Sequence, residues 1–177
     1  NQPDEMLQLG GKIQADPNLL TNIDAAHLEL LSSLENIASE KSLLAELAKP
    51  GSPIILHVDA LRYNAYKKLA HRAIVLLPEG VAAPDLPSKQ IVRYKVSEQM
   101  EDLGATRAVQ ASQQVTIDGQ NYPIASPSEG IASNTALAIV AAKYLGIVES
   151  DIRKRVEAWR PSGNRGYLET FGEQTFY

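Results

Sequence analysis

Two residues near the start of the chain, His27 and Lys41, have side chains suited to metal or group-transfer chemistry. A neutral imidazole binds divalent metal ions, and the amine of a partly buried lysine is open to covalent modification. Each residue also has an ordinary explanation. His27 fits a capping or surface position at the start of a helix, and Lys41 fits a solvated partner of Glu40 or Glu46. Position alone leaves both explanations open.

Other polar residues stand where the predicted elements begin or end. Asn134 begins an apolar helical stretch, where asparagine is a preferred N-cap. Arg165 lies in the glycine-bracketed loop PSGNRGY, where an arginine can reach a phosphate or stay exposed. Asp59 ends a predicted strand, at the edge where α/β sheets bind ligands. His57 and His71 have no carboxylate or histidine at metal-binding spacing, so we interpret both as structural.

The composition indicates a soluble globular protein. The chain has 177 residues, of which 44% are hydrophobic, enough to bury the core of one domain. Its net charge of −4 gives no basic surface, so we expect no nucleic-acid partner. The absence of cysteine excludes disulfides and thiolate metal sites. No apolar run approaches the roughly 20 residues of a membrane span, and no signal segment opens the chain, so we expect a cytoplasmic protein.

Short apolar runs alternate with helical patterns, which is typical of a parallel α/β sheet. From Thr106 polar and apolar residues alternate around Asp118-Gly119, a strong turn pair, and indicate an antiparallel ribbon. The predicted fold class is therefore α/β, a mostly parallel sheet with flanking helices plus a small antiparallel ribbon. The expected strands are 18–23, 53–58, 73–78 and 90–96, and the expected helices are 4–15, 25–31, 34–48, 60–73, 133–147 and 149–159.

Four stretches, taken in order, resemble the Mur ligases, the ATP-dependent amide ligases of peptidoglycan precursor synthesis. TNIDAAHLELLSSLENIASEKSLL resembles their central-domain motif, in which an asparagine precedes an AHLE or DHLD sequence and a lysine follows the histidine by 14 positions. NQPDEMLQLGGKI resembles the segment after the glutamate-bearing strand, SNTALAIVAAKYLGI the NALAA helix, and RPSGNRGYLE the junction into the C-terminal domain. The resemblance covers nearly the whole chain and is weakest from 63 to 120.

The resemblance implies a set of site residues. His27 and Lys41 would be ligands of a second Mg²⁺, Lys41 after carbamylation by CO₂. Carbamylation replaces a cation by an anionic oxygen donor, which suits a hard ion such as Mg²⁺. Asn22, Asn134 and Arg165 would bind the ATP cofactor, the last two as the family's nucleotide-contacting asparagine and arginine.

The implied reaction activates a carboxylate as an acyl phosphate at the expense of ATP, and an amine then attacks it. The AHLE form is most like the member of the family that adds D-alanyl-D-alanine to the UDP-N-acetylmuramoyl tripeptide. Residues 1–165 would be the later part of the ATP-binding central domain, and 166–177 the start of the C-terminal domain. Because the family's phosphate loop and metal-binding glutamate are not in this sequence, we expect an incomplete domain, inactive without the remainder of the ligase chain.

Two departures from the family pattern keep other functions open. Gly130 stands where the family has a histidine before Asn134, and Gly163-Asn164-Arg165 contains a one-residue insertion. One alternative is a ligase like the folylpolyglutamate or cyanophycin synthetases. Another is a non-catalytic relative that uses the same fold for binding. The last is an unrelated α/β domain in which the spacing of His27 and Lys41 is a coincidence.

Overall fold

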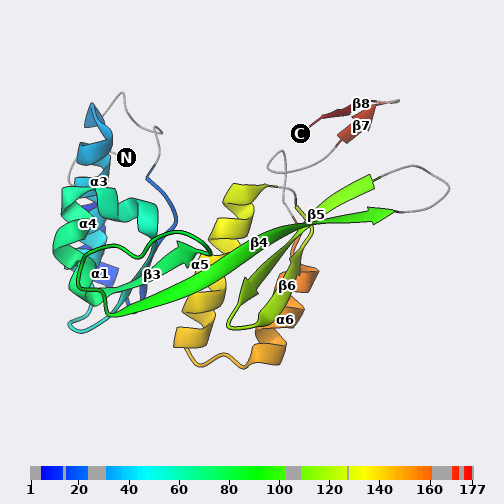
Figure 1. Cartoon of the computed structure of the whole chain (residues 1–177). Coiled ribbons are helices and arrows are strands. Elements are labelled where there is room, and N and C mark those ends of the chain that lie inside the picture. The colour runs from blue at the N-terminus through cyan, green and yellow to red at the C-terminus, as the bar shows by residue number, and fades with distance from the viewer. Residues whose placement is uncertain are drawn as a thin grey trace. The chain divides into compact units, whose positions relative to one another are not determined.

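The structure, a computed structural model, is shown in Figure 1 and divides into two units, Asn1–Val92 and Arg93–Tyr177. The residues described are 5–13, 15–23, 31–102, 109–126, 128–160, 169–171 and 174–176.

The elements follow the α/β pattern that the sequence predicts. Strands β1 to β6 form one mixed sheet in that order, and β7 and β8 form a separate two-stranded sheet. In chain order the elements are α1 (Glu5–Ile13), β1 (Asn18–Leu20), α3 (Leu34–Glu46), β2 (Ile54–His57), η1 (Val58–Arg62), α4 (Asn64–Leu69), η2 (Ala70–Arg72), β3 (Ala73–Pro78), β4 (Gln90–Asp102), β5 (Val109–Ile117), β6 (Gln120–Ile124), α5 (Glu129–Tyr144), α6 (Glu149–Ala158), β7 (Glu169–Phe171) and β8 (Gln174–Phe176).

Parallel strands form the core of the first unit. Leu20 of β1 is paired with Leu56 of β2, and Leu56 with Val75 of β3. Consecutive residues of β2, such as Ile54 and Ile55, are both fully buried. A strand buried on both faces needs a continuous apolar run, and the sequence IILH supplies one. The predicted α/β fold class is therefore confirmed, with a parallel part here and an antiparallel part in the second unit.

Helix α3 organises the helices of the first unit. Its N-cap is Ser33, the residue directly before the predicted helix 34–48, whose hydroxyl accepts a hydrogen bond from the backbone N–H of Asn36. Two of its carboxylates serve neighbouring helices: Glu40 accepts from the N–H of Met6 in α1 at 3.1 Å, and Glu35 accepts from the N–H of Asn64 in α4 at 2.9 Å. Carboxylates are favourable at helix N-termini because they satisfy unpaired N–H groups and the positive end of the dipole.

A glycine allows α1 to approach the C-terminal end of α3. Gly10 is buried, and a Cβ added there would lie 2.9 Å from Cδ1 of Leu47. The glycine pair weakens the helix on propensity alone, but this packing leaves no room for a side chain at Gly10. We expect Gly10→Ala to force α1 away from Leu47.

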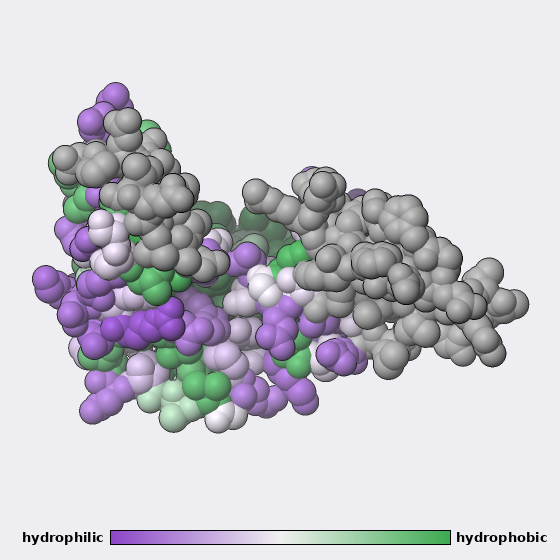
Figure 2. All heavy atoms as spheres, turned by 90° about the horizontal axis from the view of Figure 1, so that it is seen from above, coloured by the Kyte–Doolittle hydropathy of each residue, from purple (hydrophilic) through white to green (hydrophobic). Residues whose placement is uncertain are grey.

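The second unit contains the antiparallel ribbon. Strand β5 pairs with β4 and with β6, and Val115 lies opposite Tyr122. Asp118 and Gly119 form the hairpin turn with φ of 52° and 75°, a conformation that the Asp-Gly pair readily adopts. Helix α5 contacts β5, and α6 contacts β6. Figure 2 shows mainly hydrophilic residues, with smaller hydrophobic patches, over the described surface in its view.

Several predicted boundaries differ from the structure. Strand 18–23 ends at Leu20, and strand 90–96 continues to Asp102 because its backbone pairs with β5 throughout. The predicted helix 60–73 is divided: Tyr63, extended at φ −89° and ψ 135°, separates η1 from α4. Helix η2 follows α4, and Ala73 already belongs to β3. Most of the predicted helix 25–31 lies outside the described residues. Among the described helices, none is long and apolar enough to cross a membrane.

A cluster of charged and aromatic side chains joins the hairpin turn to the two helices beside it. Lys143 of α5 donates from Nζ to Oδ2 of Asp118 at 3.0 Å, and its Nζ lies 3.7 Å from Oε2 of Glu149. The guanidinium of Arg153 donates to the carbonyl of Asn121 at 2.7 Å and lies over the ring of buried Tyr122. These contacts fasten the turn to both helices.

This cluster predicts sensitivity to alkali. Burial, helped by Glu149, raises the pKa of Tyr122 above 10.0. Burial alone lowers the pKa of Lys143, but its hydrogen bond to Asp118 and the nearby tyrosine outweigh this, so its pKa rises above 10.5. Both groups hold their protons more tightly when folded. Their contribution to stability is therefore complete below about pH 10 and is lost as the pH rises through the raised values.

We expect Tyr122→Phe in the intact protein to change the free energy of unfolding at pH 7 by less than about 1 kcal/mol. Above pH 10 the free energy of unfolding should decrease less steeply with pH in this variant than in wild type. Urea unfolding measured between pH 8 and pH 11.5 tests this. Tyr144→Phe is the matched control, because Tyr144 is 41% exposed. Equal slopes in Tyr122→Phe and wild type would contradict the assignment.

Candidate functional site

Helix α3 brings Lys41 to the end of a parallel strand. Its Nζ donates a hydrogen bond of 3.0 Å to the backbone carbonyl of Asn22, two residues beyond Leu20, the last residue of β1. Lys41 is half-buried. The carboxyl ends of parallel strands are where open α/β sheets bind ligands. The amine of Lys41 therefore lies at the edge of the sheet where such ligand sites occur in open α/β folds.

The acids proposed as ordinary partners of Lys41 make other contacts. Glu40 accepts from the N–H of Met6, and Glu46 accepts from the hydroxyl of Ser42 at 3.4 Å. The side chain of Asn22 is exposed, and its Oδ1 accepts from the hydroxyl of Thr21 at 3.5 Å. The main-chain carbonyl of Asn22 therefore holds the amine of Lys41, while the carboxamide of Asn22 stays at the surface.

Two predicted site residues lie outside the described part of the chain. His27 falls in 24–30 and Arg165 in 161–168. Their assignments, to Mg²⁺ and to the nucleotide respectively, remain predictions. Among the residues that the structure does describe, no group of three or more His, Cys, Asp or Glu side chains could hold a metal ion.

A histidine and a carboxylate meet at the end of the next strand. Nδ1 of His57, the last residue of β2, lies 3.1 Å from Oδ2 of Asp59. The same nitrogen faces the N–H of Asp59 at 3.4 Å, so His57 also caps η1. The capping contact agrees with the structural interpretation of His57. The contact between His57 and Asp59 was not predicted, because metal-ligand spacing does not reveal a pair two positions apart at a strand end.

Asn134 lines a pocket in the second unit. It lies in the second turn of α5, whose N-cap is Ser128, with its hydroxyl 3.4 Å from the N–H of Ile131. The N-cap interpretation of Asn134 is therefore wrong, because the N-cap of the helix is Ser128, six positions earlier. The pocket has a volume of about 290 Å³ and is lined by Ile124, Ile131, Asn134, Thr135, Ala138, Val156 and Trp159.

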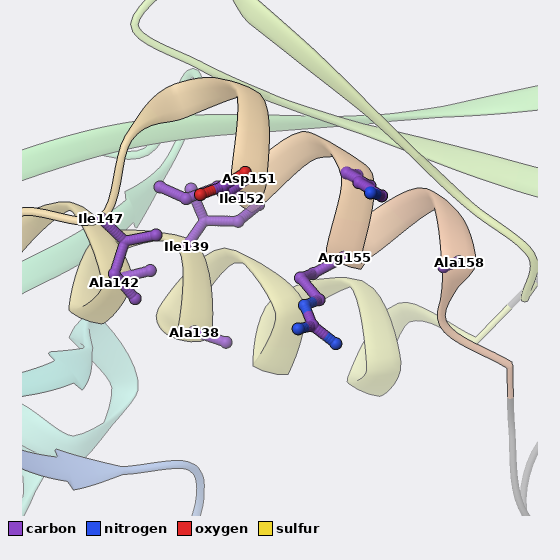
Figure 3. Close-up of a pocket in the computed structure, with 9 residues that line it drawn as sticks. Ala138, Ile139, Ala142, Ile147, Asp151, Ile152, Arg155 and Ala158 are labelled. Atoms are coloured by element: carbon purple, nitrogen blue, oxygen red, sulfur yellow. The ribbon is translucent and has the colours of Figure 1, made fainter.

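A larger groove adjoins this pocket at Ala138 and continues between α5 and α6. Its volume is about 670 Å³, and its walls are mainly apolar. Figure 3 shows Ala138, Ile139 and Ala142 on the α5 side, and Arg155 extending from α6. The pocket of Asn134 thus combines hydrogen-bonding groups with an indole, whereas the groove offers small apolar side chains with charged residues on α6.

Comparison with known proteins agrees with the fold. The Mur ligase middle domain model matches residues 1–142. The chain therefore belongs to the Mur ligase middle-domain family, which confirms the resemblance found in the sequence. No curated protein matches the chain in sequence.

The structure is similar to crystal structures of MurF from Acinetobacter baumannii. One has a TM-score of 0.67 at 19% identity, covering 98% of this chain and 36% of that chain. Another, the UDP-N-acetylmuramoylalanyl-D-glutamyl-2,6-diaminopimelate–D-alanyl-D-alanyl ligase of the same organism, has a TM-score of 0.63 at 18% identity, covering 99% of this chain and 36% of that one. Identities this low establish the fold alone. The chain spans little more than a third of the length of these ligases.

Proposed function

We propose that this chain is part of an ATP-dependent amide ligase of peptidoglycan precursor synthesis, acting in the cytoplasm. Residues 1–165 are the later part of the ATP-binding central domain, and 166–177 begin the C-terminal domain. The observation that carries the proposal is the Nζ of Lys41, held by the carbonyl of Asn22 at the carboxyl end of β1. The family match over 1–142 supports it.

The chemistry at Lys41 starts from its amine. The lone pair of neutral Nζ attacks the carbon of CO₂ and forms an N–C bond, while one C–O π bond opens and its electron pair moves to oxygen. One proton leaves the nitrogen to solvent. The carbamate nitrogen keeps one N–H, which can still donate to Asn22, while its two oxygens become anionic acceptors. The hydrogen bond to a main-chain carbonyl therefore fits both the free and the carbamylated lysine, and it orients the modified side chain.

ATP and Mg²⁺ are the cofactors of the proposal. Carbamylated Lys41 and His27 would hold a Mg²⁺ ion, completed by donors from the remainder of the ligase. The donor chemistry fits, because a free lysine ammonium repels the ion, whereas the carbamate supplies the hard oxygen ligand that it prefers. When bound, the ion neutralises negative charge that develops on phosphate oxygens. Asn22, Asn134 and Arg165 would contact the nucleotide.

For the substrates we propose the carboxylate of a UDP-linked muramoyl tripeptide and the amine of D-alanyl-D-alanine. The similar Acinetobacter baumannii enzyme is named as a D-alanyl-D-alanyl ligase, and the AHLE form of the motif supports the same substrate. A folylpolyglutamate- or cyanophycin-synthetase-like substrate is the alternative. Gly130, which replaces a family histidine, is the reason to test a non-catalytic relative as well.

ADP release by the intact protein tests the proposal. With Mg²⁺, ATP and the UDP-tripeptide, we expect turnover with D-alanyl-D-alanine and background release with L-glutamate, L-aspartate or L-arginine as amine donors. Turnover with one of these amino acids and its matching acceptor would keep the ligase class and change the substrate. Absence of turnover together with absence of ATP binding by calorimetry would overturn the proposal.

A further inference from the structure

Trp159 occupies a position in the Asn134 pocket that its helix fixes. It is the C-cap of α6, and its backbone N–H donates to the carbonyl of Val156 at 3.2 Å. Its own carbonyl accepts from Nη1 of Arg160 at 2.7 Å, and the same nitrogen donates to the carbonyl of Glu157 at 2.7 Å. Three hydrogen bonds thus hold the backbone around Trp159.

The indole of Trp159 is not enclosed by the residues around it. It is 40% exposed, although it lines a pocket with the apolar side chains of Ile124, Ile131 and Val156. Aromatic rings bury a large area at little entropic cost, and a partly exposed indole in a pocket offers its face for stacking. This is the only tryptophan of the chain.

The polar groups of the pocket suit one edge of a planar heteroaromatic ring. Asn134, which lines the pocket, carries a carboxamide with both a donor and an acceptor. This combination pairs with the amino group and the neighbouring ring nitrogen of adenine. Thr135 adds a hydroxyl. A volume of about 290 Å³ lies at the lower limit for ligand pockets. It therefore fits a single base rather than a whole nucleotide.

Gly130 leaves unfilled space near the start of α5. Gly130 lies one turn before Asn134, on the same side of the helix. A Cβ added at Gly130 would contact only the hydroxyl of Ser128, at 3.7 Å. Packing therefore does not require a glycine at position 130. Without a side chain, Gly130 leaves space beside this turn of α5 for a bound ring.

We propose that Trp159 is the stacking wall of the adenine pocket and a determinant of base specificity. The indole covers one face of the purine while Asn134 reads its edge. The proposal rests on the proposed function, because it takes ATP to be the nucleotide. Stacking on an aromatic side chain favours purines over the smaller pyrimidines, because the purine offers more area for contact. Trp159 would then favour ATP over CTP, and Asn134 would distinguish adenine from guanine.

Calorimetry on the intact protein with Mg²⁺-ATP and Mg²⁺-CTP tests this role. We expect Trp159→Leu to weaken ATP binding about tenfold or more and to reduce the preference for ATP over CTP, whereas Trp159→Phe should stay within about threefold of wild type. Arg155→Ala is the matched control, since Arg155 lines the neighbouring groove of the same helix. We expect its ATP affinity to be unchanged.

Tryptophan fluorescence supplies a measurement that does not depend on whether Trp159→Leu folds. The difference between wild type and Trp159→Phe isolates the emission of Trp159. We expect this emission to change with Mg²⁺-ATP but not with Mg²⁺-tripolyphosphate, which has no base. An equal fluorescence response to Mg²⁺-ATP and Mg²⁺-tripolyphosphate would overturn the role of Trp159. Wild-type ATP affinity and base preference in Trp159→Leu, with weaker ATP binding in Asn134→Ala, would overturn it too. Either result would leave the ligase proposal standing. A wild-type protein that binds no ATP would overturn both.

Discussion

Lys41→Ala is expected to lower the turnover of the intact ligase by about a thousandfold or more. In the proposed mechanism this substitution removes the carbamate oxygens that hold a metal ion beside the transferring phosphate. Stabilisation of developing charge by a metal ion is worth several kcal/mol, and about 4 kcal/mol corresponds to a thousandfold in rate. The rate of ADP release at saturating ATP and substrates measures the loss.

The hydrogen bond from Lys41 to Asn22 should matter little for folding. A single partly exposed hydrogen bond contributes about 1 kcal/mol, so Lys41→Ala should melt near the wild-type temperature. Lys67→Ala is the matched control, because Lys67 is exposed on α4 and has no assigned role. Wild-type turnover in Lys41→Ala, or a loss shared by Lys67→Ala, would contradict the role of Lys41. Bicarbonate should restore activity to a decarbamylated wild-type sample and have no effect on Lys41→Ala.

The second large effect is on stability. Leu137→Ala should lower the free energy of unfolding by about 2 to 5 kcal/mol, because it leaves a cavity at a fully buried position of α5. Leu145→Ala changes the same residue type at a position 58% exposed and should cost less than about 1 kcal/mol. Hydrogen exchange of the α5 amides in the intact protein, with urea unfolding, measures both. Equal losses in the two variants would contradict the packing described for α5.

Short sequence motifs predicted the features of the fold that depend only on residues adjacent in the chain. Ser33 caps α3 and Asp118-Gly119 turns the hairpin as expected, because both features are set within a few positions. The break at Tyr63 and the extension of β4 to Asp102 were not predicted. Strand β4 continues because it pairs with β5, and a pairing partner elsewhere in the chain leaves little trace in the strand's own sequence.

The same limit applies to the candidate site. The spacing of His27 and Lys41 pointed to Lys41, but its acceptor is a main-chain carbonyl, which no side-chain pattern reveals. Asn134 was identified through the family motif. Its interpretation as an N-cap failed because Ser128, Glu129 and Gly130, where the helix begins, carry no apolar side chain that would extend the helical pattern. Trp159 was overlooked because it joins Asn134 only when α6 packs beside α5.

The carbamate itself gives the most direct test of the central claim. Carbon-13 NMR of the intact, active protein with labelled bicarbonate should show a carbamate carbon bound to the protein in wild type and in Lys67→Ala. The signal should be absent from Lys41→Ala. An active wild-type ligase without this signal, or a signal that persists in Lys41→Ala, would contradict the account of Lys41 as a carbamylated metal ligand.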